Sequence, residues 1–193
     1  MDRREFLKTG LSFAGALTGA TYGLSSAVNA SGSAGTAQQN LSRTLANALR
    51  SIGSKRCIAA AEELEASNRD DGGVRLHLRN AGLNASDVLT IAHALKSVSR
   101  KEASSLASLS FSYNEAIGDA GVVTLAQALP AGLRELGLVG CGIGDQGGEA
   151  LLQWASHAQQ LSMICIEQNN FSESMREQFN ELARTNTNLL LVV

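Results

Sequence analysis

The sequence lacks the features of several large protein classes. Its 16 basic and 18 acidic residues give a net charge of −2, so it has no excess of positive charge for binding a nucleic acid. The three cysteines, Cys57, Cys141 and Cys165, have neither the spacing of a metal site nor that of a disulfide framework. Because three is an odd number, at least one thiol stays free or pairs between chains. Aromatic residues make up only 4% of the chain and proline occurs once, whereas 19 glycines suit short turns and closely packed layers.

The first 30 residues have the pattern of an export signal. Residues 2–8, DRREFLK, contain two adjacent arginines followed by Phe, Leu and Lys, and a Gly/Ala-rich apolar run follows over residues 9–24. Small residues over 27–30 suit a cleavage site. The pattern resembles a bacterial twin-arginine (Tat) signal, which implies that residues 1–30 are removed and that the mature protein is periplasmic or extracellular. The alternative, a membrane anchor, is disfavoured because serine, threonine and glycines interrupt the apolar run.

The rest of the chain divides into three predicted parts. Residues 31–39, rich in small side chains, are predicted to form a disordered linker. Apolar residues at helical spacing predict two helices, over 40–52 and 55–67, and we interpret residues 40–73 as a helical cap with a degenerate first repeat. Residues 74–193 contain the regular repeats. A cap is expected because the first repeat of a solenoid would otherwise leave apolar surface in water.

A repeated pattern fills the chain after residue 73. The stretch over residues 106–129, LASLSFSYNEAIGDAGVVTLAQAL, recurs with variations from Leu133 and from Leu161, and an earlier copy starts at Val74. Each copy alternates apolar and variable residues, as a strand with one buried face does, and continues with helical spacing. The strand-end position holds Ala81, Asn114, Cys141 and Asn169. A buried side chain there can bond the backbone of the neighbouring turn. A period of about 28 residues predicts a solenoid.

These repeats resemble the leucine-rich repeat family, specifically its ribonuclease-inhibitor-like class with a long helix in each repeat. The matching pattern is LxxLxLxx(N/C) followed by (I/L)GDxGxxxLAxAL, over residues 106–129 and 133–155. The resemblance implies an α/β fold, a short right-handed solenoid with one strand and one helix in each repeat of about 28 residues. The strands would line the concave side and the helices the outside. Asp119 and Asp145, each following a glycine, are predicted to provide helix-capping carboxylates.

The variable positions around each strand form the predicted binding surface, because concave faces in this family usually bind protein. The candidates are Arg75, His77, Arg79, Ser108, Ser110, Ser112, Tyr113, Arg134, Glu135, Met163, Glu167 and Gln168. The first three make one end basic, and the last two make the other end weakly acidic. The alternative is an ordinary solvated face. We expect the residues that the repeat pattern leaves unspecified in the best-preserved copy to contribute most: Ser108, Ser110, Ser112 and Tyr113.

No set of residues predicts catalysis, a cofactor or a metal site. Cys165 and His77 share the concave face, but they lie three strands apart, about 14 Å at a strand spacing of about 4.8 Å, which is too far for a catalytic pair. His93 and His157 have no plausible metal-binding partner nearby in the sequence. GDAG and GDQG lack the lysine and the glycine spacing of a phosphate-binding loop.

The sequence therefore predicts an exported, non-catalytic module that binds a partner protein through its concave face. Two alternatives stay open: an accessory subunit of an exported enzyme, with or without a cofactor, and a host-directed repeat effector. Neither nucleic acid nor a stable membrane span after signal cleavage is expected. The last apolar stretch, residues 189–193, would begin a further repeat with an unpaired edge. We expect homodimerisation through this strand, or cover by another segment.

Overall fold

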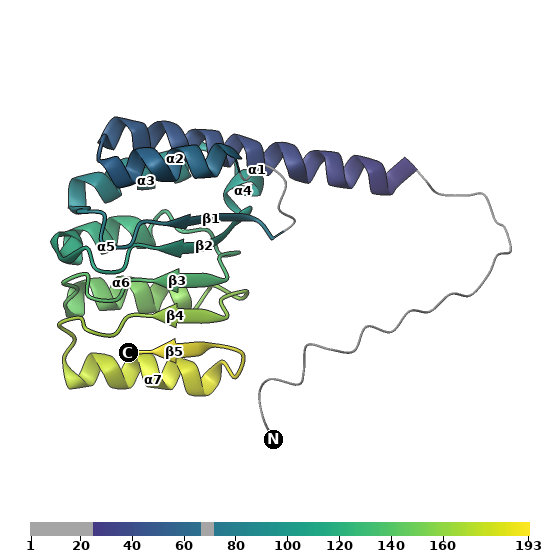
Figure 1. The fold of residues 1–193 in the computed structure, drawn as a ribbon. Helices are drawn as coiled ribbons and strands as arrows, with labels where there is room; N and C mark the ends of the chain where they lie inside the picture. Colours follow the sequence, from purple (N-terminus) through teal and green to yellow (C-terminus); the bar gives the residue numbers. More distant parts are fainter. Residues whose placement is uncertain (1–24, 67–71) are drawn as a thin grey trace, which may run out of the picture.

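The computed structural model describes residues 25–66 and 72–193, which form layered strand–helix repeats beneath two N-terminal helices (Figure 1). The part of the predicted twin-arginine signal over residues 1–24 lies outside the described residues. In chain order the elements are α1 (Ser25–Ile52), α2 (Lys55–Ala66), β1 (Val74–His77), α3 (Ala85–Ser97), α4 (Arg100–Ala103), β2 (Leu106–Ser110), η1 (Glu115–Ile117), α5 (Gly118–Ala126), β3 (Glu135–Gly137), α6 (Asp145–Ala155), β4 (Met163–Cys165), α7 (Glu173–Thr185) and β5 (Leu190–Val192).

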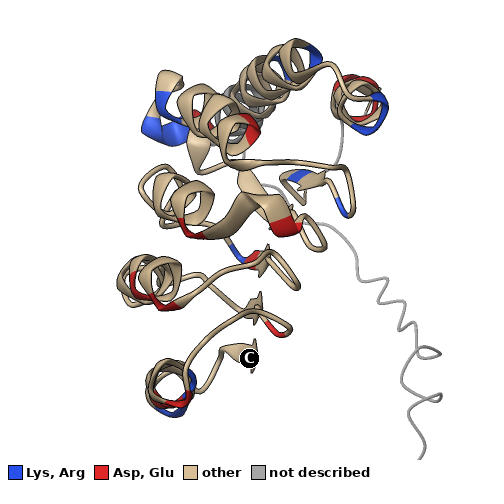
Figure 2. Ribbon diagram, turned by 90° about the vertical axis from the view of Figure 1, so that its left-hand side faces the viewer, with Lys and Arg blue, Asp and Glu red and all other residues tan. Residues whose placement is uncertain are grey.

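The strands form one parallel sheet in chain order, β1-β2-β3-β4-β5. The register aligns equivalent residues, so that Leu76 pairs with Leu109, Leu109 with Leu136, and so on to Leu191. The long repeat helices cover one side of this sheet (Figure 2). This arrangement confirms the predicted α/β solenoid. A helix between consecutive strands is the connection that parallel pairing requires.

The core lies between the sheet and these helices. At least one apolar residue of each strand from β1 to β4 is completely or almost completely buried, as Leu76, Leu109 and Leu136 illustrate. The helix positions that the repeat pattern marked as apolar are also fully buried: Ile91, Leu125, Leu151 and Phe179. Each fully buried aliphatic or aromatic side chain of this kind contributes about 1.5–3 kcal/mol through removal from water.

α1 and α2 close the N-terminal end of the stack. Leu41, Leu45 and Leu49 lie four residues apart on one face of α1, and all three are fully buried. The predicted disordered linker over residues 31–39 is wrong, because α1 begins at Ser25 and runs through this segment. The segment contains no proline to stop a helix, and Ala37 is already buried within it. The predicted cleavage site over residues 27–30 also lies in α1.

Buried asparagines join each layer to the layer before it. Asn114 Oδ1 accepts hydrogen bonds from the backbone N–H groups of Ala81 and Leu83, at 2.8 and 3.0 Å. Its Nδ2 donates to the carbonyl oxygen of Leu78 at 2.8 Å. Asn169 makes the same set of bonds to the turn that follows β3. The prediction that strand-end side chains bond the neighbouring turn is confirmed at both positions.

Asp119 and Asp145 each join a layer to the layer that follows it. Asp119 Oδ1 accepts from the N–H groups of Gly144 and Gly147, at 2.7 and 2.9 Å, at the start of α6. Asp145 likewise accepts from Ser172 N–H, just before α7, at 2.8 Å. Each carboxylate therefore serves the next repeat's helix rather than its own, which corrects the expected capping role. Hydrogen bonds from Ser172 lower the pKa of Asp145.

Candidate functional site

A shallow hollow of about 340 Å³ lies on the side of the sheet turned away from the repeat helices, here called the concave face. β1 shows how the sequence forms this face, because alternate residues Arg75 and His77 are exposed while their neighbours are buried. The hollow is lined by His77, Arg79, Ser108, Leu109, Ser110, Ser112, Glu135, Leu136, Gly137, Val139, Met163, Cys165 and Glu167. The structure thus brings most of the predicted binding residues together around one depression.

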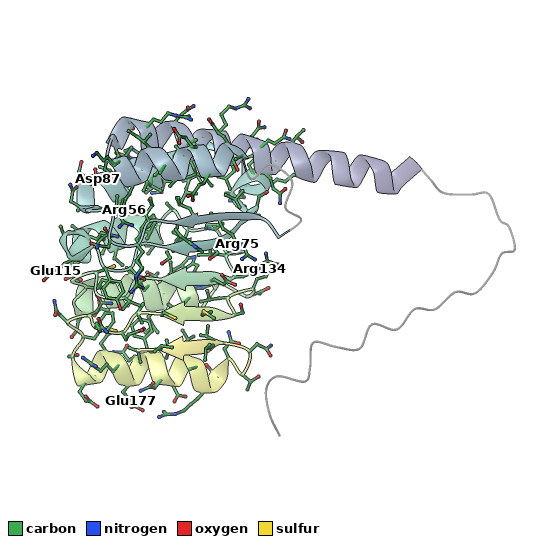
Figure 3. All side chains as sticks on the ribbon, in the orientation of Figure 1. Arg56, Arg75, Asp87, Glu115, Arg134 and Glu177 are labelled. Carbon is green, nitrogen blue, oxygen red and sulfur yellow. The ribbon has the colours of Figure 1, made fainter. Side chains whose placement is uncertain are left out.

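Arg75 and Arg134 lie beside this hollow rather than in it. They line an adjoining depression of about 240 Å³ together with Ser108 and Glu135. Figure 3 shows both arginines at the same end of the strands. The Arg134 guanidinium donates a hydrogen bond to the carbonyl oxygen of Gly72, which holds its side chain toward β1. This edge of the face therefore presents two cations and one carboxylate.

The serines at the centre form the floor of the hollow. Ser108 and Ser112 are each only 4% exposed. The Ser108 hydroxyl lies 2.8 Å from His77 Nε2, and the Ser112 hydroxyl accepts from the Val139 N–H at 3.2 Å. Gly137 keeps the floor open, because a Cβ there would lie 2.8 Å from Ser110 Oγ. Ser108 and Ser112 therefore offer a partner little surface, despite the weight that the sequence prediction gave them.

Tyr113 stands at the rim of the face in an unusual conformation. Its φ of 63° lies in the left-handed region, as do those of Asn80, Gly140 and Gln168 at the equivalent strand ends. The Arg79 guanidinium stacks over the Tyr113 ring, 3.9 Å from its centroid. The carbonyl oxygen of Arg79 in turn accepts from Arg56 of α2 at 3.3 Å. α2 thus borders the concave face at its β1 end.

The opposite end of the concave face is apolar and exposed. Met163 is 37% exposed, and its register partner Leu190 is 55% exposed. Cys165 pairs in the same way with Val192, which is 40% exposed. The sequence prediction did not include Leu190 and Val192. The sequence could have indicated them, because Leu190 and Val192 occupy the same strand positions in β5 as Met163 and Cys165 do in β4.

Glu167 contributes an unpaired acceptor to the hollow. Its Oε2 is buried and has no hydrogen-bond partner among the described residues. A buried acceptor without a partner costs about 1–3 kcal/mol. The Glu167 side chain also lines the hollow, where its carboxylate can accept a hydrogen bond from a bound molecule.

Two layers of the structure match a known protein family. Residues 103–126 and 133–152, which contain β2 to α5 and β3 to most of α6, match the family model described as Leucine Rich repeat. These two segments are leucine-rich repeats. No curated protein matches the sequence. Within the described residues, no helix of these repeats or of their cap is long and apolar enough to cross a membrane.

The thiols of Cys141 and Cys165 lie in environments that disfavour the reactive thiolate. Burial, together with the charge of Glu167, raises the pKa of the Cys165 thiol. Burial raises the pKa of the Cys141 thiol to about 11. Both thiols are therefore protonated at neutral pH and poorly nucleophilic. His77 contacts Ser108, but no described carboxylate is hydrogen-bonded to this pair, which lacks the third group of a hydrolytic triad.

Metal binding finds no support in the described part of the repeats. No group of three or more His, Cys, Asp or Glu side chains there could hold a metal ion. β1 and β4 are the first and fourth strands of the sheet, so His77 and Cys165 do not adjoin. What the concave face does provide is a varied set of side chains on a rigid sheet, a surface suited to binding.

Proposed function

We propose that the concave face of this leucine-rich repeat protein binds a segment of a partner protein, and that the chain itself is non-catalytic. The observation that carries the proposal is the change in chemistry along the concave face from β1 to β5. The face has cations at one end, the Glu167 carboxylate in its hollow, and exposed Met163, Leu190 and Val192 at the other end. Leucine-rich repeat domains generally mediate protein–protein interactions, and both ends of this face differ from a uniformly solvated surface.

The chemistry of the face defines the partner segment. A carboxylate of the partner pairs with Arg79 or with the Arg75–Arg134 edge, since guanidinium groups bind carboxylates through charge-assisted hydrogen bonds. A donor of the partner pairs with the Glu167 carboxylate, which lines the hollow. Aliphatic or aromatic side chains of the partner cover Met163 and Leu190, where burial of apolar area contributes about 25 cal/mol per Å².

Export by the twin-arginine route is part of the proposal. Its support is the DRREFLK sequence over residues 2–8 and the small residues over 27–30. On this basis the protein acts in the periplasm or outside a bacterial cell. The presence of a helix in every regular layer supports assignment to the ribonuclease-inhibitor-like class. A second copy of the chain pairing with β5 is a further candidate partner, because an edge strand can add a strand.

Leu190→Glu is expected to weaken partner binding at least about tenfold, because it places a charge in the apolar end of the concave face. The matched control is Leu89→Glu on α3, since Leu89 is 41% exposed and lies outside the hollow. The measurement is quantitative mass spectrometry of partners recovered from envelope fractions with the tagged full chain. Equal recovery by the two variants would contradict the proposal.

A further inference from the structure

A second groove lies on the helix side of the protein, where extra residues interrupt the repeat pattern. Residues 96–104 lengthen the first regular repeat, and part of this insertion folds as α4. The groove has a volume of about 500 Å³. It runs between the end of α3, α4, and the connection after α5. The residues that line it are Leu95, Lys96, Val98, Arg100, Ala103, Ser104, Gln127, Ala128, Leu129, Pro130, Ala131 and Gly132.

α4 is held firmly in position. Ser99 and Glu102 form a reciprocal capping box at its N-terminus, with the Ser99 N–H donating to Glu102 Oε2 at 2.8 Å. The other carboxylate oxygen of Glu102 accepts from Asn40 Nδ2 of α1 at 2.8 Å. The insertion is therefore anchored to the N-terminal cap, and it provides a fixed wall for the groove.

The groove combines an apolar floor with a basic rim. Leu95 and Leu129 form the buried floor, and Lys96 and Arg100 are exposed at its edge. None of the lining residues is acidic. Among the described residues, the ion pairs involve other arginines, and the nearby carboxylate of Glu102 is occupied by Asn40 and Ser99. Figure 2 shows the basic ribbon of α4 at the upper left, on the helix side of the layers.

We infer that this groove is a second docking site, for a protein segment that places an aliphatic side chain beside acidic residues. The aliphatic side chain covers the partly exposed apolar lining residues Val98, Ala103 and Ala128, and the carboxylates pair with Lys96 and Arg100. The site is independent of the concave face, because it shares no lining residue with the hollow there. One chain can thus hold two partner segments at once, which would make it an adaptor between them.

The probe for this site is a displayed library of random 12-residue peptides, selected on the immobilised full chain. Peptides that bind are then measured by fluorescence polarisation against the Arg100→Glu and Lys101→Glu variants. Lys101 is the matched control because it is exposed on the same helix but does not line the groove. Both substitutions add an acidic residue to the first turn of α4, where negative charge is favourable, so both variants should fold.

The expected result is a class of acidic, leucine- or valine-containing peptides that bind Arg100→Glu about tenfold more weakly and Lys101→Glu within about twofold of the unchanged chain. Ala131→Trp, which fills the groove from an exposed position, should also remove their binding. If no selected peptide depends on Arg100, or if the dependent peptides carry no acidic residue, the inference is overturned. Peptides whose binding instead depends on Leu190 bind the concave face and would not support a second docking site.

Discussion

Asn114→Ala is expected to lower the free energy of unfolding by about 3–5 kcal/mol, because it leaves several buried backbone groups without partners. The N–H groups of Ala81 and Leu83 and the carbonyl of Leu78 all bond to the Asn114 amide. Asn114 itself is only 3% exposed, so water cannot replace the amide. Urea denaturation followed by circular dichroism measures the loss.

The control for this substitution is Asn84→Ala. The Asn84 side chain also accepts two backbone N–H bonds, from Ser86 and Asp87, but at the exposed N-terminus of α3. Loss of such a cap costs about 1 kcal/mol, because water can take the place of the amide. Equal destabilisation by the two substitutions would show that Asn114 does not join the layers as described.

Gly142→Ala is expected to lower the free energy of unfolding by at least about 3 kcal/mol. Gly142 has φ +68°, and a Cβ there would lie 2.5 Å from the carbonyl oxygen of Glu115 in the preceding layer. The left-handed conformation alone costs about 1–2 kcal/mol for a residue with a Cβ. The remainder comes from displacing one layer of backbone against the next. The change in urea midpoint is the measurement.

Gly82 provides the matched comparison for Gly142. It occupies the equivalent position in the first regular repeat and has φ +72°, but a Cβ there would meet nothing within 4 Å. Gly82→Ala should therefore lose only the conformational contribution of about 1–2 kcal/mol. If the two alanine variants are equally stable, close stacking of the layers at Gly142 is not a major contribution to stability.

The positions that the sequence predicted well are those governed by local periodicity. Leu76 and Leu109 alternate with variable residues, and the pleat of a strand turns this alternation directly into burial. The role of Asn114 followed from the same reasoning, since a strand that stops leaves backbone groups for a side chain to bond. These features depend on residues within one repeat or its immediate neighbour.

The features that the sequence did not predict depend on how layers meet. Asp119 bonds the start of α6 rather than its own helix because the next layer places those N–H groups beside it. Ser108 is buried because side chains such as His77 of the adjoining strand contact it. The insertion over residues 96–104 becomes a groove wall only by packing against α1. Spacing along the chain does not encode these distances.

The claim that the concave face binds the partner is tested most directly by site-specific photo-crosslinking. A photoreactive phenylalanine derivative at Tyr113, an exposed aromatic site on the rim of that face, is compared with the same group at Gln153. Gln153 is exposed on α6, on the helix side of the sheet. We predict one discrete partner adduct from position 113 and none from position 153. An adduct from position 153 without one from position 113 would contradict the assignment of the binding surface.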